Sequence, residues 1–152
     1  MRYRFVDEIV SLASDPPRIE VAKTFDPGDD ALSGPAGPDQ VPSSLLLELL
    51  AMSGGQLLFR HLGRDRLPLL LKVEDLRFGG CARPGRRLTA TAALEGEADA
   101  AGGHTMARTS ASVADEDGQP IAAGRFFYLC VKLPDGVEPG DLAVAIPGEG
   151  PR

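Results

Sequence analysis

The most apolar stretch of the chain, residues 41–59, predicts a single long helix. Leu, Ala, Met, Glu and Gln dominate it, and these are among the better helix formers. Pro42 stands where a proline is tolerated, at the first helical position, and Ser43 or Ser44 can bond the free N–H groups of the first turn. The apolar residues point in every direction around the axis, so we expect the helix to be covered on most sides. It should end between Arg60 and Gly63, where basic residues complement the helix dipole and a glycine can stop it.

Alternation of apolar and polar residues predicts strands on both sides of this helix. Residues 3–12 fit either a short strand or a helical turn that Pro16-Pro17 breaks, and residues 18–25 alternate like a half-buried strand. Four more strands are expected after the helix, at residues 69–78, 87–97, 105–114 and 120–133. Short Gly-rich and Asp-Gly connections between them predict an antiparallel, four-stranded meander. The pattern is typical of an α+β domain whose curved antiparallel sheet wraps one long central apolar helix.

The segments outside these elements are rich in glycine and proline. Residues 26–40 predict a long loop that leads directly into the helix, and loops of this length in a compact domain are often functional. Residues 134–152 are rich in Gly, Pro and acids, which predicts a flexible C-terminal tail. We therefore expect one domain over residues 1–133, followed by the tail.

Composition excludes several classes of protein. A length of 152 residues with 43% hydrophobic residues suits one domain with one core. No run of 18 apolar residues could span a membrane, and a net charge of −6 argues against nonspecific nucleic-acid binding. Cys81 and Cys130 lie far apart and only two histidines are present, so a zinc cluster is not expected. Both thiols are expected to be reduced in a cytoplasmic protein, with Cys130 in the core.

Glu48 is the only ionisable side chain in the predicted helix. A lone carboxylate on an apolar helix is costly to bury unless it is paired, hydrogen-bonded or protonated. Such a position is a candidate for acid–base chemistry, although a structural ion pair to an arginine or a bond from a backbone N–H gives the same pattern.

The order of these elements resembles the hotdog fold, and several motifs resemble the 3-hydroxyacyl-acyl-carrier-protein dehydratases. Residues 41–55, V-P-S-S-L-L-L-E-L-L-A-M-S-G-G, align without a gap with the family pattern M-P-G-V-L-x-x-E-A-M-A-Q-A-x-G. Residues 76–88 resemble V-R-F-x-x-x-V-x-P-G-D-x-L with one residue fewer, residues 118–121 resemble D-G-x-x-V, and residues 5–9 resemble L-V-D-R-V. The likeness covers about residues 3–133. It implies that Glu48 stands at the position of the catalytic glutamate.

The chain departs from this family at the second catalytic group. The family has a histidine in the loop before the helix, and the corresponding residue here is Gly34. The two histidines, His61 and His104, lie elsewhere and are expected to be surface or capping residues. Asp30 or Asp39 could serve as a substitute base, or simply as turn formers. Loss of an acid–base group costs about 10² to 10⁴ in rate, so dehydration by the family mechanism is in doubt.

The resemblance leaves three possible functions for this protein. The first is a dehydratase-like protein that acts on or binds 3-hydroxyacyl thioesters in a fatty acid or polyketide pathway. The second is a hotdog thioesterase, in which Glu48 activates water or attacks the thioester while N–H groups at the helix start bind the oxyanion. The third is a non-catalytic subunit that binds an acyl chain or an active relative. The substrate-binding residues that the resemblance implies are Gly34, Gly37, Val41, Ser43, Ser44, Met52 and Phe78.

The resemblance also implies the partners. Hotdog proteins pair two sheets edge to edge, so a homodimer or a heterodimer with a related subunit is expected, and the strand at 120–133 would otherwise leave a free edge. The substrate is expected to be a thioester of acyl carrier protein or CoA. Six arginines could receive the acidic carrier or the CoA phosphates, or could simply be dispersed solubilising charge: Arg60, Arg64, Arg66, Arg83, Arg86 and Arg87. No metal or other cofactor is suggested.

Overall fold

The fold consists of one helix and six strands, seen in a computed structural model that describes residues 5–29, 32 and 39–137. The elements are β1 (Glu8–Ser14), β2 (Pro17–Thr24), α1 (Ser43–His61), β3 (Arg66–Phe78), β4 (Arg87–Asp99), β5 (Thr105–Ala114) and β6 (Pro120–Lys132). Every predicted element is present, and the first segment is a strand rather than a helical turn. The expected C-terminal tail lies almost wholly outside the described residues. No helix in the described part of the chain is long and apolar enough to cross a bilayer.

The helix begins and ends close to the start and stop residues that the sequence predicted, but its first turn is not capped as expected. Pro42 occupies the N-cap position and no side chain caps the first turn, so the prediction that Ser43 or Ser44 bonds these N–H groups is wrong. At the other end Arg60 and His61 lie in the last turn. Gly63 then adopts a φ of 89°, which a glycine adopts without strain, and the chain turns away from the helix.

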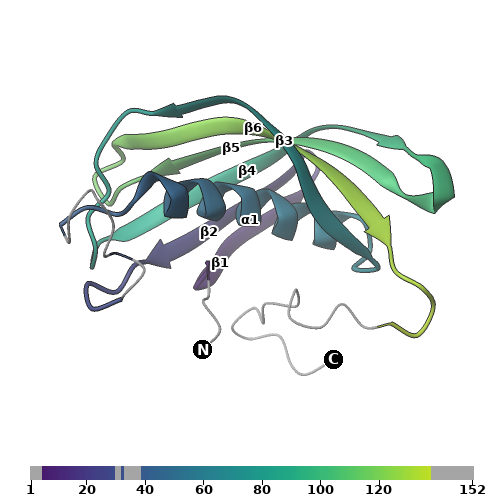
Figure 1. Cartoon of the computed structure of the whole chain (residues 1–152), viewed down its shortest axis with the longest axis horizontal. Helices are drawn as coiled ribbons and strands as arrows, with labels where there is room; N and C mark the ends of the chain where they lie inside the picture. Colours follow the sequence, from purple (N-terminus) through teal and green to yellow (C-terminus); the bar gives the residue numbers. More distant parts are fainter. Residues whose placement is uncertain (1–4, 30–31, 33–38, 138–152) are drawn as a thin grey trace.

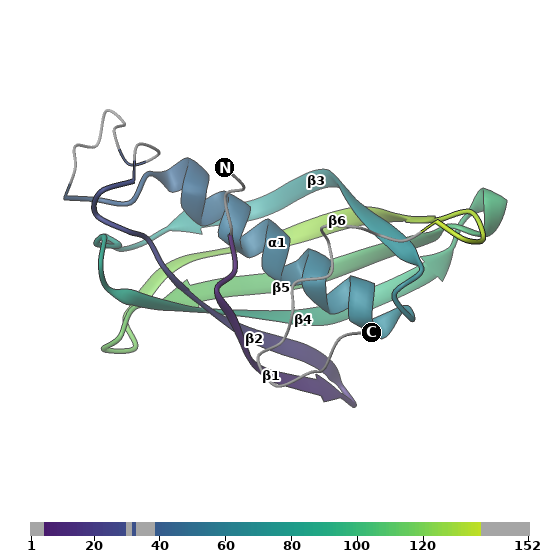
Figure 2. The same ribbon diagram turned by 90° about the horizontal axis from the view of Figure 1, so that it is seen from below.

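The six strands form one antiparallel sheet in the order β1-β2-β4-β5-β6-β3. β4, β5 and β6 form a meander, but β3 pairs with β6 at the far edge and not with β4. The predicted four-stranded meander is therefore wrong in one respect, because the chain passes β6 and β5 between β3 and β4. Figures 1 and 2 show the strands arching over one side of α1, so that the sheet curves around the helix.

The free edges of the sheet are β1 and β3, not β6. β6 lies between β5 and β3, so the prediction that residues 120–133 form an unpaired edge is wrong. β3 is 13 residues long, and three consecutive leucines on it, Leu69, Leu70 and Leu71, are 43%, 44% and 55% exposed. An edge strand with exposed apolar residues is a surface on which another chain can pair.

The core fills the space between α1 and the concave face of the sheet. Leu49, Leu50, Leu57 and Leu58 of the helix are at most 1% exposed. Leu45, Leu47 and Met52 are only partly buried, and Glu48 is exposed. The helix is thus covered on the sheet side and half-open on the other, which corrects the expectation that it is covered on most sides. Cys130 is fully buried in this core, as predicted.

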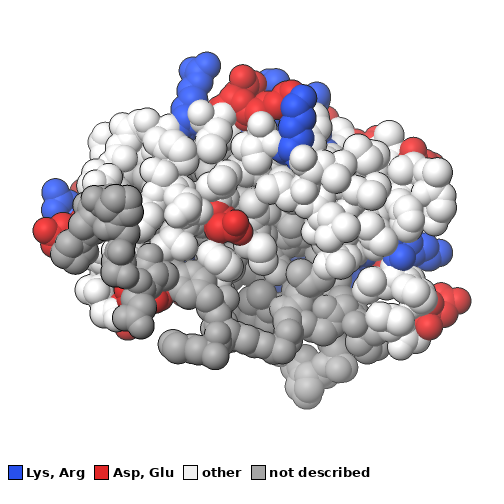
Figure 3. Space-filling view, viewed as in Figure 1, with Lys and Arg blue, Asp and Glu red and all other residues white. Residues whose placement is uncertain are grey.

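The convex face of the sheet is polar and carries a network of charges. Glu95 of β4 pairs with Arg108 of β5 at 2.9 Å and with Arg125 of β6 at 3.7 Å, and Arg125 also pairs with Asp75 of β3. In Figure 3 charged side chains stand along the upper edge, over β3 and β6, and at the two ends of the molecule, while the middle of this face is mostly uncharged.

Candidate functional site

A slot of about 200 Å³ lies between α1, β3 and β6, and Glu48 is part of its wall. The remaining lining is mostly apolar or small. It consists of Ala51, Met52, Gly55, Gln56, Phe59, Pro68, Leu70 and Tyr128. Small-molecule sites in proteins are typically apolar pockets with a few polar groups, as this slot is.

The helix side of the slot is one face of α1. Glu48, Met52, Gly55 and Phe59 follow one another at intervals of four, three and four residues, which places their Cα atoms in one row along the helix. From Glu48 to Phe59 this row is roughly 16 Å long at about 1.5 Å per residue. The slot therefore runs along the helix, with the carboxylate toward the N-terminal end and an aromatic ring toward the C-terminal end.

The sheet side of the slot is made by Pro68 and Leu70 of β3 and by Tyr128 of β6. Tyr128 is 2% exposed, and its hydroxyl donates a hydrogen bond of 2.7 Å to the backbone carbonyl of Ala51. Burial raises the pKa of Tyr128 well above its usual range, so the phenol stays protonated at physiological pH and remains a donor. This bond ties the middle of α1 to β6 beside the slot.

Glu48 is the only carboxylate of the slot lining, and it is exposed to solvent in the single chain. The expectation of a buried lone carboxylate is therefore wrong, because the sheet covers the opposite side of the helix. Its place next to an apolar slot is nevertheless suited to chemistry on a bound substrate. A carboxylate there can reach both solvent water and a ligand that lies in the slot.

The structure brings only some of the predicted site residues together. Met52 lies beside Glu48 in the slot lining. Ser43 and Ser44 are exposed at the helix start and Phe78 is 43% exposed at the end of β3, all three outside the lining. Val41 is buried, and its N–H donates to the carbonyl of Ala82 at 2.8 Å. The predicted residues Gly34 and Gly37, and the alternative base Asp30, lie outside the described residues.

Neither histidine lies in the slot. The Nε2 atom of His61 lies 3.2 Å from a carboxylate oxygen of Glu97, at the exposed C-terminal end of α1. The Nδ1 atom of His104 accepts a hydrogen bond from the N–H of Lys132 at 3.0 Å. Both residues have the structural surroundings that the sequence predicted. The alternative base Asp39 is exposed and is not part of the slot lining.

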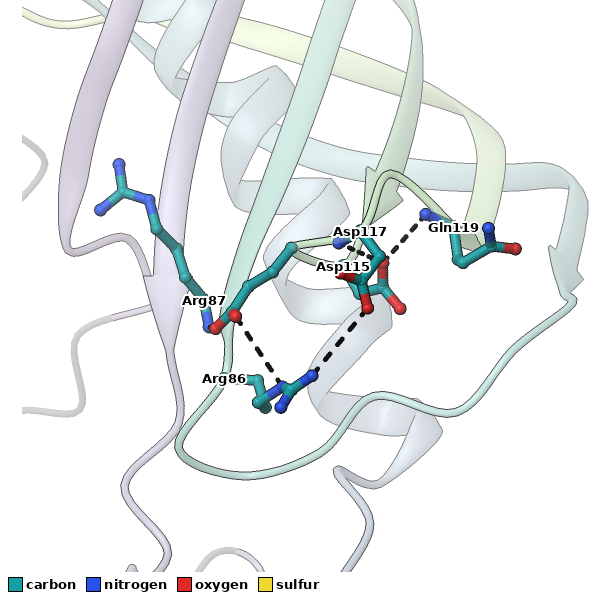
Figure 4. A network of polar contacts seen from close by, with 6 residues as sticks. Arg86, Arg87, Asp115, Asp117 and Gln119 are labelled. Carbon is teal, nitrogen blue, oxygen red and sulfur yellow. Dashed lines mark hydrogen bonds and ion pairs between the residues drawn. The ribbon is translucent and has the colours of Figure 1, made fainter.

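Three of the six arginines proposed to attract a phosphate or an acidic carrier are paired with acids. Arg87 pairs with Glu8 at 3.2 Å, and Arg86 lies 3.9 Å from Glu116. Figure 4 shows Arg86 and Arg87 beside the turn between β5 and β6, where Asp115 holds the N–H groups of Asp117 and Gln119. Arg66 pairs with its neighbour Asp65 at 2.6 Å. These pairs reduce the positive charge available to an anionic ligand.

Most of the slot lining was not predicted from the sequence. Gly55 and Phe59 could have been found by extending the helical spacing from Glu48 and Met52 along the same face. Pro68, Leu70 and Tyr128 come from distant strands, and their approach depends on the crossing of β3 to the far edge of the sheet. Within the described residues, no three His, Cys, Asp or Glu side chains lie close enough together to hold a metal ion.

Comparison with solved structures finds similar folds among proteins of low sequence identity. A protein of Streptococcus mutans UA159, smu.793, bound to acetyl CoA is 14% identical over 83% of this chain and 89% of that chain, with a TM-score of 0.62. A hypothetical thioesterase with coenzyme A from Streptococcus pneumoniae TIGR4 is 10% identical over 83% and 86%, with a TM-score of 0.63. A hot-dog-like protein from Thermanaerovibrio acidaminovorans is 16% identical over 77% and 82%, with a TM-score of 0.61.

These similarities and the architecture establish the fold. The chain has the hotdog fold, with one helix packed against a curved, six-stranded antiparallel sheet. No protein-family model and no curated protein sequence matches the chain.

Proposed function

We propose that this protein binds an acyl thioester and hydrolyses it, with the acyl group in the slot beside α1 and Glu48 as the acid–base residue. The observation that carries this proposal is the position of Glu48, the single carboxylate on the wall of an otherwise apolar slot. Such a slot suits an apolar acyl chain, and an acid at its wall suits proton transfer at the thioester carbonyl.

The mechanism follows from these two features. Glu48 takes a proton from a water molecule, whose oxygen attacks the thioester carbonyl carbon. The C–S bond of the tetrahedral intermediate breaks, the carboxylic acid forms, and the departing thiolate takes up a proton. Alternatively, the carboxylate attacks the carbonyl itself, the C–S bond breaks and the thiolate leaves, and water then hydrolyses the resulting anhydride to the carboxylic acid and free Glu48. In both cases the amides of Ser43 and Ser44, at the positive end of the helix dipole, are candidates to stabilise the oxyanion.

The comparisons support thioester chemistry in general terms. Among the proteins of similar fold, one is described as bound to acetyl CoA and one as a hypothetical thioesterase with coenzyme A. CoA is therefore the carrier that we propose first, with acyl carrier protein as the alternative.

A second copy of the chain, or a related hotdog subunit, is proposed to cover the β3 edge. Leu70 lies on this edge and also lines the slot, so a chain that pairs with β3 would lie next to the bound acyl group. Pairing would satisfy the free backbone groups of β3 and cover its exposed leucines. The site would then be enclosed by two chains, which is how we account for the exposure of Glu48 in one chain alone.

Dehydration of a 3-hydroxyacyl thioester is the second candidate function. The gap-free match of residues 41–55 to the dehydratase pattern favours it, since Glu48 falls on the catalytic glutamate. Against it stands the absence of both histidines from the slot lining. A role as a non-catalytic subunit is the remaining alternative.

The experiment that tests the proposal measures two products for each substrate, the free thiol released by hydrolysis and the thioester that has lost one water. The purified protein is incubated with acetyl-, hexanoyl- and 3-hydroxybutyryl-CoA and with the matching acyl-carrier-protein thioesters, and products are measured by mass spectrometry. We expect release of free thiol, lost in the Glu48→Gln variant. Loss of one water from the 3-hydroxyacyl thioester, with the thioester intact, would instead establish the dehydratase. Neither product from any substrate would overturn both enzymatic functions.

A further inference from the structure

Gly55 lines the slot on the helix side, opposite Pro68 of β3. A Cβ atom placed on Gly55 would lie 3.9 Å from the Cβ atom of Pro68, which is van der Waals contact. Any side chain at position 55 would therefore bridge the helix and β3. Along this face of the helix, Gly55 lies between Met52 and Phe59.

We propose that Gly55 selects the length of the acyl group, by leaving the slot open past Pro68 for a short apolar chain. The inference rests on the proposed binding of an acyl thioester in this slot and adds the substrate class. A cavity of about 150 Å³ lined by apolar side chains holds one benzene molecule. At about 200 Å³ the slot has room for an acyl group of roughly six to eight carbon atoms.

The geometry of the helix gives the same order of length. Gly55 lies seven residues after Glu48 on the same face of α1, which is about 10 Å along the axis. An extended alkyl chain advances roughly 1.3 Å per carbon–carbon bond, so about eight carbon atoms bring the end of a chain whose carbonyl lies at Glu48 to Gly55. Phe59 is 1% exposed and Tyr128 is 2% exposed, so packing fixes both the wall at Phe59 and the wall that Tyr128 forms near Ala51.

The glycine at this position is not required by the backbone. Gly55 lies inside α1, where alanine is the better helix former by about 1 kcal/mol. Its neighbour differs, because a Cβ atom on Gly54 would lie 2.5 Å from the Tyr128 hydroxyl. Packing therefore accounts for Gly54, whereas the open slot accounts for Gly55.

The test measures binding and hydrolysis separately in the full-length protein. Binding of S-ethyl-, S-octyl- and S-dodecyl-CoA, thioethers that cannot be hydrolysed, is measured by calorimetry for the wild type, Gly55→Ala and Gly55→Val. Gly96→Ala is the matched control, since a Cβ atom there meets nothing within 4 Å and Gly96 does not line the slot. We expect the wild type to prefer the octyl chain, and Gly55→Ala to lose 10- to 200-fold in octyl affinity with ethyl affinity unchanged.

The outcomes distinguish the inference about chain length from the proposed thioester hydrolysis. An unchanged order of chain lengths in Gly55→Ala and Gly55→Val would overturn the inference and leave thioester binding intact. A wild type that binds the dodecyl chain as tightly as the octyl chain would also overturn it. A length shift without hydrolysis of any acyl-CoA would support the inference and overturn the hydrolase function. No binding of any thioether would overturn both. Thermal unfolding identifies a misfolded variant, because Gly55→Ala is expected to be at least as stable as the wild type.

Discussion

The hydroxyl of Tyr128 lies 2.7 Å from the carbonyl oxygen of Ala51 and donates a hydrogen bond to it across the interface between β6 and α1. The hydroxyl can come this close to the helix because residue 54 has no side chain. The bond is buried, and it lies beside the slot that carries Glu48. The close packing at Gly54 therefore positions the helix face on which the proposed chemistry depends.

This packing predicts that Gly54→Ala destabilises the fold. The added methyl group would lie 2.5 Å from the Tyr128 hydroxyl and 2.7 Å from the Thr109 hydroxyl, so the helix or the strands must shift. We expect a loss of about 1–3 kcal/mol in the free energy of unfolding, because overpacking of a core has costs of this size. Urea denaturation measures it.

A variant of Tyr128, whose hydroxyl the added methyl group would contact, provides the control for this prediction. Tyr128→Phe removes the hydroxyl and its bond, with an expected loss of about 1 kcal/mol alone. In the double variant the clash with the phenol oxygen is gone, so the two losses should be less than additive. Strict additivity would show that Gly54→Ala acts through some other contact.

A second prediction concerns the two thiols. Cys81 is exposed and Cys130 is fully buried, and burial raises the pKa of Cys130 to about 11. At pH 8 a thiol reagent should label one cysteine of the folded protein quickly and the second only in denaturant, because the thiolate is the reactive form. Cys81→Ala should abolish the fast reaction. A fast reaction in that variant would contradict the buried position of Cys130.

The same pKa gives a pH dependence of stability. The folded-state pKa of Cys130 is raised above its ordinary value of 9.0, so the folded state holds the proton more tightly than the unfolded state. This contribution is fully present below about pH 9 and is lost as the pH rises toward about 11. We expect the unfolding free energy of the wild type to fall more steeply over this range than that of Cys130→Ala.

A third prediction separates the role of Glu48 in chemistry from its role in the fold. Because its side chain is exposed, Glu48→Gln should change the free energy of unfolding by less than about 0.5 kcal/mol. If it is the general base, hydrolysis of acyl-CoA should fall by about 10² to 10⁴-fold. Glu97→Gln is the matched control, since Glu97 is also exposed and lies outside the slot. Equal rates in both variants would exclude Glu48 from the reaction.

The sequence predicted the elements better than their arrangement. Local patterns were sufficient for α1 and for the meander of β4, β5 and β6, because each depends on residues close in the chain. The position of β3 was not predictable in this way, since its pairing with β6 joins residues 44 to 66 positions apart, from Phe78 with Ala122 to Arg66 with Lys132. The exposure of Glu48 was missed for the same reason. It depends on which side of the helix the sheet covers, and an evenly apolar helix does not specify that side.

The last prediction tests the proposed partner at the β3 edge. Leu71 is 55% exposed on this edge, and a charge there would oppose pairing with another chain. We expect Leu71→Asp to be monomeric in light scattering under conditions in which the wild type is dimeric, and to lose hydrolysis if the second chain encloses the slot. Met106→Asp is the matched control, because Met106 is also apolar, is 38% exposed and lies on β5 in the interior of the sheet. An unchanged mass for Leu71→Asp would show that the wild type does not assemble through β3. A monomer with full activity would show that one chain completes the site, and the exposure of Glu48 would then be its working state.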